Sequence, residues 1–188
     1  EVVDGVRTTV LARTAVDVAL TTDFERALAV LDSALRLGAG FADLQERLKG
    51  PRKGVGQARR ALHHADSRAA NPGESWCRAQ MIEAGFPEPR LQRAYLLGNG
   101  HTAEVDFDFE GQVVLEFDGL VKYTGAYLGP GQTPSDVVVA EKIREDGLRE
   151  LGLDVVRAVW ADLRAQTLLP TLARHLAARG VRVPAAFA

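Results

Sequence analysis

Apolar and polar residues alternate along two neighbouring stretches in the middle of the chain. Residues 103–109 and residues 113–118 both show this period of two, which is typical of half-buried strands. Glu110-Gly111 between them indicates a short turn, so the two strands should be adjacent and antiparallel. Acids then share a face on each strand: Glu104, Asp106 and Asp108 on the first, Glu116 and Asp118 on the second.

The pattern along the rest of the chain changes character near residue 67. Before it, an extended segment at 1–12 is followed by helices at about 13–20, 22–38, 41–48 and 57–64. After it, we expect a helix at 73–84, strands at 90–97, 102–109 and 112–118, a helix at 134–151, a strand at 153–159 and a helix at 163–179. The predicted fold class is α/β (α+β), a mixed sheet flanked by helices. A mainly helical region, 1–66, precedes the domain 67–188.

Composition and charge narrow the class of protein to which the chain can belong. The 188 residues are 46% hydrophobic and 26% charged, which is typical of a globular protein and not of a disordered one. The formal net charge of -2 excludes a global basic field, so any nucleic-acid contact must come from local patches. The lone Cys77 excludes an internal disulfide and fits a reducing, cytoplasmic compartment. No apolar run reaches the roughly 18 residues of a membrane span. The chain starts without Met, and we expect an N-terminal truncation.

The acidic strands predict a metal site. Crowded carboxylates repel one another unless a cation lies between them, and a divalent metal with oxygen ligands is the usual solution. Glu104 and Asp108, which flank Asp106, are expected to belong to the solvated face of the sheet. The alternative is that all these acids form the polar outer face of an antiparallel sheet.

Five stretches in the second half carry a family resemblance: Asn71-Pro72-Gly73-Glu74-Ser75, Val105-Asp106-Phe107, Leu115-Glu116-Phe117-Asp118-Gly119, the run from Glu141 to Asp146, and the run from Leu151 to Arg157. Over about residues 70–162 the chain resembles the restriction-endonuclease-like PD-(D/E)xK superfamily, and within it the Vsr-like branch related to very-short-patch-repair endonucleases. The resemblance implies a restriction-endonuclease-like mixed sheet and a Mg²⁺-dependent endonuclease or nickase acting on DNA.

The resemblance also implies a set of catalytic residues: Glu74, Asp106, Glu116, Asp118 and Lys122. Asp106, Glu116 and Glu74 would hold the metal. Asp118 occupies the position where the superfamily motif has Lys, so Lys122 or Lys142 would have to supply the positive charge. The alternative for Glu74 is an acid at a helix N-terminus that pairs with Arg78 one turn later.

The first half resembles actinobacterial proteins that carry an Arg-Thr-x-x-Asp stretch, here Arg13 to Asp17, often downstream of an AbiEi-type antitoxin winged helix. That winged helix would be absent here. Basic side chains expected to bind nucleic acid are Lys49, Arg52, Lys53, Arg59, Arg60, Lys142 and Arg144. A solvated basic helix pair is the alternative for the first five.

Two functions remain open. One is an active nuclease. The other is a catalytically inactive nuclease-fold antitoxin or transcriptional regulator that binds DNA, a protein partner or a second copy of itself.

Overall fold

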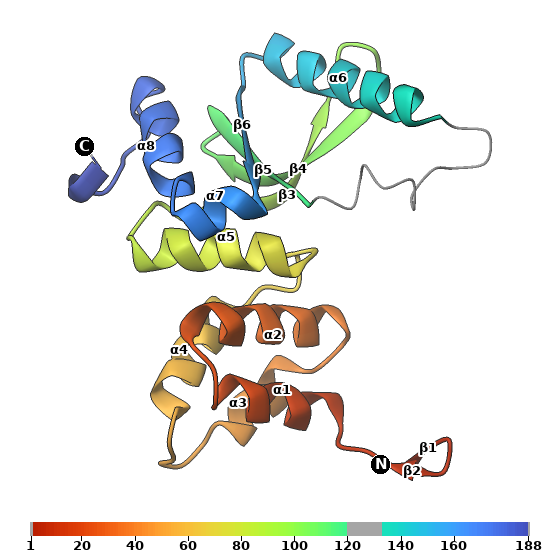
Figure 1. Cartoon of the computed structure of the whole chain (residues 1–188), viewed down its shortest axis with the longest axis vertical. Helices are drawn as coiled ribbons and strands as arrows, with labels where there is room; N and C mark the ends of the chain where they lie inside the picture. The colour runs from red at the N-terminus through yellow and green to blue at the C-terminus, as the bar shows by residue number, and fades with distance from the viewer. Residues whose placement is uncertain (1, 120–132, 188) are drawn as a thin grey trace. The chain divides into compact units, whose positions relative to one another are not determined.

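The chain divides into two units between Gln80 and Met81, in a computed structural model that describes residues 2–119 and 133–187. The predicted fold class is confirmed: a four-stranded mixed sheet is flanked by helices, and a helical region precedes it (Figure 1). Helix α5 (Pro72–Glu83) runs across the division. The sequence-based division at residue 66 lies ahead of this helix.

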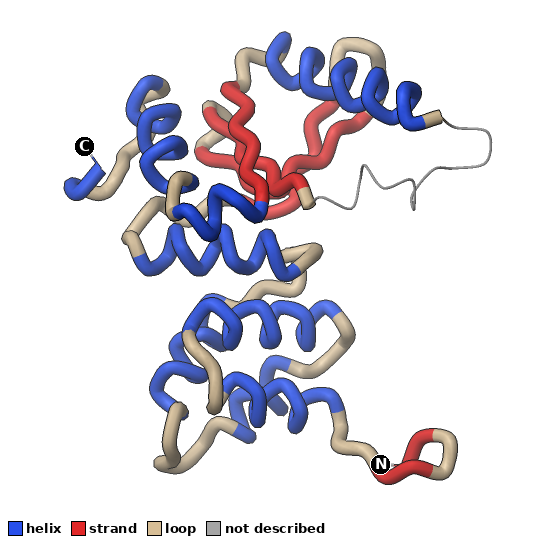
Figure 2. Tube along the Cα trace, in the orientation of Figure 1, coloured by secondary structure: helices blue, strands red, loops and turns tan. Residues whose placement is uncertain are grey.

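Helices make up most of the first unit (Figure 2). After a two-stranded hairpin, β1 (Val2–Val3) and β2 (Val6–Arg7), come α1 (Leu11–Ala19), α2 (Phe24–Arg36), α3 (Phe41–Arg47) and α4 (Val55–His64). Alanines and leucines at helical spacing are fully buried, among them Ala19, Ala27, Leu28, Leu31, Leu44 and Ala58. Small side chains on facing helices allow close approach, and burial of the leucines stabilises the packing.

The start of α1 differs from the prediction. The helix begins at Leu11, two residues earlier than expected, with Val10 at its N-cap position. Thr14 lies inside the helix, where its hydroxyl donates to the Val10 carbonyl at 3.4 Å. Asp23 does cap α2, because its carboxylate accepts from the Arg26 amide at 2.9 Å.

Gly54 is required by the turn into α4. Its φ of +77° lies in the left-handed region, and a Cβ at this position would come within 1.9 Å of the Leu20 carbonyl oxygen. The turn therefore passes directly against the C-terminal end of α1, and only glycine fits both conditions.

A buried ion pair joins α5 to α2 within the first unit. The Asp32 carboxylate accepts from Arg78 Nη1 at 2.8 Å, from Ser75 Oγ at 2.8 Å and from the Asp66 amide at 2.7 Å. Arg78 also donates to the His64 carbonyl. Burial raises the pKa of Asp32, and the charge of Arg78 opposes that rise. Arg78 therefore forms a buried ion pair with a residue of another helix, 46 positions earlier in the chain.

The second unit is built on a mixed sheet in the order β3, β4, β5, β6. Its strands are β3 (Arg90–Leu96), β4 (Thr102–Phe109), β5 (Val113–Asp118) and β6 (Asp154–Val159). The first three strands pair antiparallel, and β6 pairs parallel to β5, with Leu115 opposite both Phe107 and Val156. The parallel pair needs a crossover, which contains α6 (Pro134–Glu150).

Helices cover both faces of this sheet (Figure 1). On the α6 face, Leu148 packs with Val105 and Val114 in an apolar cluster, and a Cβ on Gly147 would come within 3.0 Å of Leu97. Helix α8 (Leu168–Ala178) covers the other face, where His175 Nδ1 lies 2.7 Å from Asp154 Oδ2. The α6 helix thus brings its side chains to the face formed by the even-numbered residues of β5.

The end of the chain differs from the single predicted helix at 163–179. Two helices, α7 (Trp160–Ala165) and α8, are separated at Gln166, whose φ of +56° is left-handed. A short turn of helix, η2 (Ala185–Phe187), follows. Within residues 2–119 and 133–187, none of the helices has the length and apolar character that a membrane span requires.

Candidate functional site

The regular alternation of β4 breaks at Asp106. The pairing of β4 with β3 includes Val105 and Phe107 but skips Asp106. Val105 packs in the same cluster as Val114, which is the partner of Asp108 in β5. Val105 and Asp108 therefore lie on the same side of the sheet, although a strand with strict alternation would place them on opposite sides.

The prediction that Glu104, Asp106 and Asp108 share one face is consequently wrong. Glu104 is exposed, whereas Asp108 is buried on the side of Val105. Asp108 accepts from Arg93 Nη1 at 2.5 Å and from the Gly111 amide at 2.8 Å, so it fixes the β4–β5 turn. It is not a solvated surface acid, as the sequence suggested.

The carboxylate of Asp106 lies against the peptide group that joins Glu116 to Phe117. Its Oδ2 accepts from the Phe117 amide at 2.8 Å, and its Oδ1 lies 3.4 Å from Gln92 Nε2. The backbone pairing of β4 with β5 stops at Phe107, so the side chain takes over as acceptor for the next β5 amide. The two carboxylates predicted as metal ligands, those of Asp106 and Glu116, therefore come from adjacent positions on neighbouring strands.

Glu116 is almost completely buried and is held by an arginine of α6. Arg144 Nη1 donates to Glu116 Oε1 at 2.8 Å, and Nη2 donates to Oε2. This bidentate geometry is the strongest arrangement of an arginine with a carboxylate. The same guanidinium donates to both oxygens of Glu141, at 3.0 and 2.7 Å. The cation beside the predicted ligand is therefore Arg144, and not Lys142.

A second arginine of the site, Arg157 of β6, binds Asp118. Arg157 Nη1 donates to Asp118 Oδ2 at 2.7 Å, while Nη2 contacts Glu141 and Glu145, both at 2.6 Å. Glu141 thus links the two arginines. We call the set Glu116, Asp118, Glu141, Glu145, Arg144 and Arg157 the ionic network.

The charges of this network shift the pKa values of its members. Hydrogen bonds from Arg144, helped by the charge of Arg157, lower the pKa of Glu141 to about 2. Glu141 and Glu116 raise the pKa of Arg144. For Arg157, burial acts to lower the pKa, but the charges of Glu141, Glu145 and Asp118 outweigh it and the pKa rises. Glu141, Arg144 and Arg157 are therefore charged at neutral pH.

These contacts change the electrostatic argument for a metal. Guanidinium groups already compensate Glu116 and Asp118, so the closeness of these acids does not by itself require a bound ion. In the part of the chain that the structure describes, no three or more His, Cys, Asp or Glu side chains are placed to hold a metal together. Mg²⁺ in phosphoryl-transfer sites uses one or two carboxylates, with water and phosphate oxygens completing the shell. Two carboxylates from neighbouring strands, such as those of Asp106 and Glu116, match that number of ligands.

Glu74 belongs to the first unit, where it stabilises the start of α5. Its carboxylate accepts from the Ala70 amide at 2.7 Å and from Asn71 Nδ2 at 2.5 Å. Asn71 Oδ1 in turn accepts from the amides of Gly73 and Glu74. Together these bonds satisfy amides at the helix N-terminus. This is the helix-terminal position that was predicted as the alternative for Glu74, and an Asn followed three residues later by Glu is a signature of such a helix start.

The remaining predicted residues are distributed as follows. Lys122, and the glycine-rich stretch up to residue 132, lie outside the described residues.

The basic side chains predicted to bind nucleic acid differ in their contacts. Arg59 donates to the carbonyls of Leu48 and Gly50 at 2.9 and 3.1 Å, which closes the end of α3. Arg60 lies over the Phe24 ring at 4.1 Å, and Lys49 pairs with Glu46 at 2.5 Å. Three further basic side chains are exposed: Arg52, Lys53 and Lys142.

Comparison with known proteins gives distant relatives. No protein-family model matches the sequence, and no solved structure is significantly similar to it. The chain is similar to "Uncharacterized protein MT2308" of Mycobacterium tuberculosis (strain CDC 1551 / Oshkosh) and to "Uncharacterized protein Rv2248" of Mycobacterium tuberculosis (strain ATCC 25618 / H37Rv). Each relative is 33% identical over 180 residues, which cover 93% of this chain and 63% of the relative. The chain thus spans less than two thirds of the length of the curated relatives it matches.

Proposed function

We propose that the second unit hydrolyses phosphodiester bonds of DNA, as an endonuclease or nickase of the Vsr-like kind, with Mg²⁺ or Mn²⁺ held by carboxylates. The chain order of α5, β3, β4, β5, α6 and β6 is the order that the resemblance implies. One observation carries the proposal: the Asp106 carboxylate lies against the Glu116–Phe117 peptide, beside a buried Glu116 that binds Arg144.

Each residue has a chemical role in this proposal. Asp106 and Glu116 would hold the ion, which when bound supplies an activated water and neutralises charge on the phosphate. Arg144 provides the positive charge that the superfamily takes from the Lys of its motif, and it can stabilise the negative charge that develops on the phosphate oxygens. Arg157 holds Asp118, the acid at the motif Lys position, in place.

Arg144 also limits the affinity of the site for an ion. Both oxygens of Glu116 accept hydrogen bonds from this guanidinium, so a cation that takes one of the oxygens displaces an N–H donor. We therefore expect weak metal binding without DNA and stronger binding when a phosphate group offers Arg144 another partner. We place the activity in the cytoplasm, because Cys77, the single cysteine of the sequence, suits a reducing compartment.

A second candidate function is favoured by the same network. Since arginines compensate both Glu116 and Asp118, these charges are balanced without a metal, as they would be in a non-hydrolysing antitoxin or regulator. Such a protein would use the nuclease fold to bind DNA, a partner protein or a second copy of itself.

A plasmid-nicking assay with Mg²⁺ or Mn²⁺ separates the two functions. The test variant is Asp106→Asn, which keeps an oxygen acceptor for the Phe117 amide but removes the charge. The matched control is Glu104→Gln, an exposed acid on the same strand. We expect nicking by the wild-type chain and the control, and at least a 100-fold loss in Asp106→Asn. Equal nicking by all three proteins would reject this site, and no nicking by any of them would favour the regulator.

A further inference from the structure

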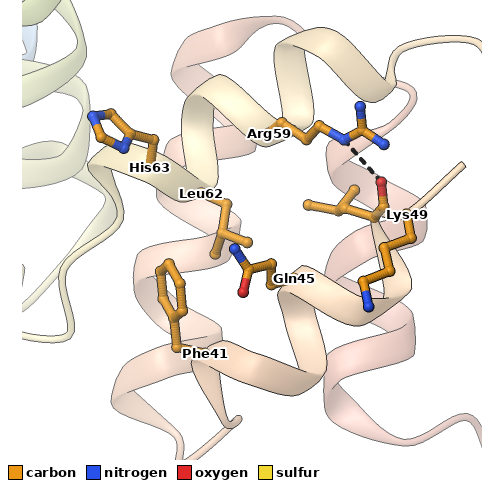
Figure 3. Close-up of a pocket in the computed structure, with 7 residues that line it drawn as sticks. Phe41, Gln45, Lys49, Arg59, Leu62 and His63 are labelled. Carbon is orange, nitrogen blue, oxygen red and sulfur yellow. Dashed lines mark hydrogen bonds between the residues drawn. The ribbon is translucent and has the colours of Figure 1, made fainter. Parts of the chain in front are cut away.

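A cavity of about 540 Å³ opens between α3 and α4 in the first unit. Phe41, Gln45 and Lys49 line one side, four residues apart along the chain, and Arg59, Leu62 and His63 line the other (Figure 3). In Figure 3 the side chains of Phe41, Gln45 and Leu62 point toward one another, with His63 near one end and Lys49 near the other. The volume lies within the range of about 300–1,000 Å³ that is usual for small-ligand sites.

The walls combine an aromatic face with an apolar floor. Phe41 is 47% exposed, although it is one of the largest apolar side chains in this unit. Leu48 and Leu62 are buried beneath it and give the cavity an apolar base. The exposed amide of Gln45 offers one donor and one acceptor group at the edge. A flat apolar ligand with polar edges fits these walls.

The surroundings of the cavity are basic, although the whole chain carries a net charge of -2. Residues 41–64 contain six Arg or Lys side chains and two acids. Arg59 donates to neutral carbonyls, so no acid cancels its charge in those bonds, whereas Lys49 shares its charge with Glu46. Arg52 and Lys53 are exposed in the turn between the two helices. This local field favours a polyanion.

We infer that the cavity binds single-stranded nucleic acid, with one base stacked on Phe41 and the adjoining phosphates near Arg52, Lys53 and Lys49. Aromatic side chains inside a basic groove are the usual means of binding unpaired strands, because every base has a flat face and every linkage carries a charge. This inference deepens the DNA-binding part of the proposed function. It does not depend on hydrolysis, because the cavity and the ionic network lie in different units.

Fluorescence anisotropy with a labelled ten-residue oligothymidylate tests the inference on the full chain, in EDTA so that no metal-dependent cleavage occurs. Phe41→Ala should weaken binding about tenfold, the loss expected for one base–aromatic stack. Leu37→Ala removes an apolar side chain of the same unit that is more exposed than Phe41 and does not line the cavity, and it should stay within twofold of the wild type. Phe41→Trp should restore binding, and its added tryptophan fluorescence should be quenched by the oligonucleotide.

The contribution of the basic side chains is measured by the salt dependence of oligothymidylate binding. Lys53→Gln should reduce the slope of log K against log salt concentration by about 0.7, as expected for one phosphate contact on a single strand. Arg26→Gln, an exposed arginine on α2, should leave the slope unchanged.

Equal oligothymidylate binding by Phe41→Ala and the wild type would overturn the inference. So would poly-glutamate binding that Phe41→Ala weakens to the same extent, because the cavity would then accept acidic peptides. Asp106→Asn should bind oligothymidylate normally, so a failure of the proposed nuclease activity is distinguishable from a failure of this site.

Discussion

Arg144 binds Glu116 with both of its terminal nitrogens, across the gap between α6 and β5. The Nη1–Oε1 distance is 2.8 Å, and 28 residues separate the partners in sequence. The acid is buried on a strand whose residues are all buried, so it needs a partner at close range. The pair compensates a buried charge on the α6 face, and it holds a cation where the proposed chemistry needs one.

Removal of that arginine should destabilise the second unit. Arg144→Met leaves Glu116 buried and uncompensated, and we expect a loss of about 1–3 kcal/mol in the free energy of unfolding, because the arginine is partly exposed. Urea denaturation at pH 7 measures the loss. Arg149→Met is the control: Arg149 on the same helix is exposed, and its partner Glu145 keeps a second arginine, Arg157, so the loss should be less than about 1 kcal/mol. Similar losses in both variants would show that Glu116 tolerates burial without its partner.

A variant that retains hydrogen-bonding capacity should separate metal binding from catalysis. In Arg144→Gln the positive charge is lost and Glu116 is released, so Mn²⁺ measured by calorimetry should bind more tightly than in the wild type. Plasmid nicking should nevertheless become slower, because the charge that stabilises the phosphate is missing. Tighter binding together with faster nicking would mean that Arg144 only blocks the ion.

The low pKa of Glu141 predicts an acid-sensitive contribution to stability. A folded-state pKa of about 2, below the ordinary 4.5, stabilises the folded protein above pH 4.5, and this stabilisation is lost as the pH falls toward 2. Because the Glu141 side chain is still 28% exposed, we expect Glu141→Gln to cost only about 1–2 kcal/mol at pH 7, and less at pH 3.5. Asp146→Asn, an exposed acid on the same helix, serves as control in the urea titrations at both pH values. If the difference in free energy of unfolding between Glu141→Gln and the wild type were the same at both pH values, the low pKa of Glu141 would be contradicted.

The buried Asp32–Arg78 pair predicts a pH effect of the opposite sign. Arg78→Met leaves Asp32 without its cation and should cost about 3–5 kcal/mol at pH 7. Burial already raises the pKa of Asp32, and loss of Arg78 raises it further. An acid with a raised folded-state pKa is less destabilising as the pH falls, because the folded state takes up the proton first. The gap between variant and wild type should therefore narrow from pH 7 to pH 5 in urea titrations. If the difference in free energy of unfolding instead widened between pH 7 and pH 5, the raised pKa of Asp32 would be refuted.

Two glycines of one segment allow a matched test of backbone geometry. Gly54→Ala combines a left-handed φ with a contact of 1.9 Å to the Leu20 carbonyl, so it should destabilise the first unit by more than about 2 kcal/mol. Gly56→Ala lies within α4, where a Cβ meets no atom within 4 Å, and it should be neutral or stabilise by up to about 1 kcal/mol. Thermal melting followed by circular dichroism compares them. Equal melting temperatures would show that the turn adjusts to a side chain.

The order of helices and strands was readable from the sequence because it depends on local patterns. Alternation of period two and helical spacing are properties of neighbouring residues, and the short turn at Glu110-Gly111 placed β4 beside β5. For the same reason, Asp106 and Glu116 could be assigned to adjacent strands. The break in the alternation of β4 at Asp106 could not be predicted from the sequence. It arises where the β4–β5 pairing ends and the Asp106 side chain replaces a backbone acceptor.

The sequence by itself determined which elements form and which acids lie on neighbouring strands, since both follow from contacts between nearby residues. Only the tertiary structure decided the partner of each charge. Asp118 pairs with Arg157 across 39 residues, and Asp32 pairs with Arg78 across 46. Such pairs cannot be predicted from the spacing of three or four residues that brings side chains together on one helix. A buried carboxylate takes the cation that packing brings within about 3 Å, and that choice is made when helices and strands dock.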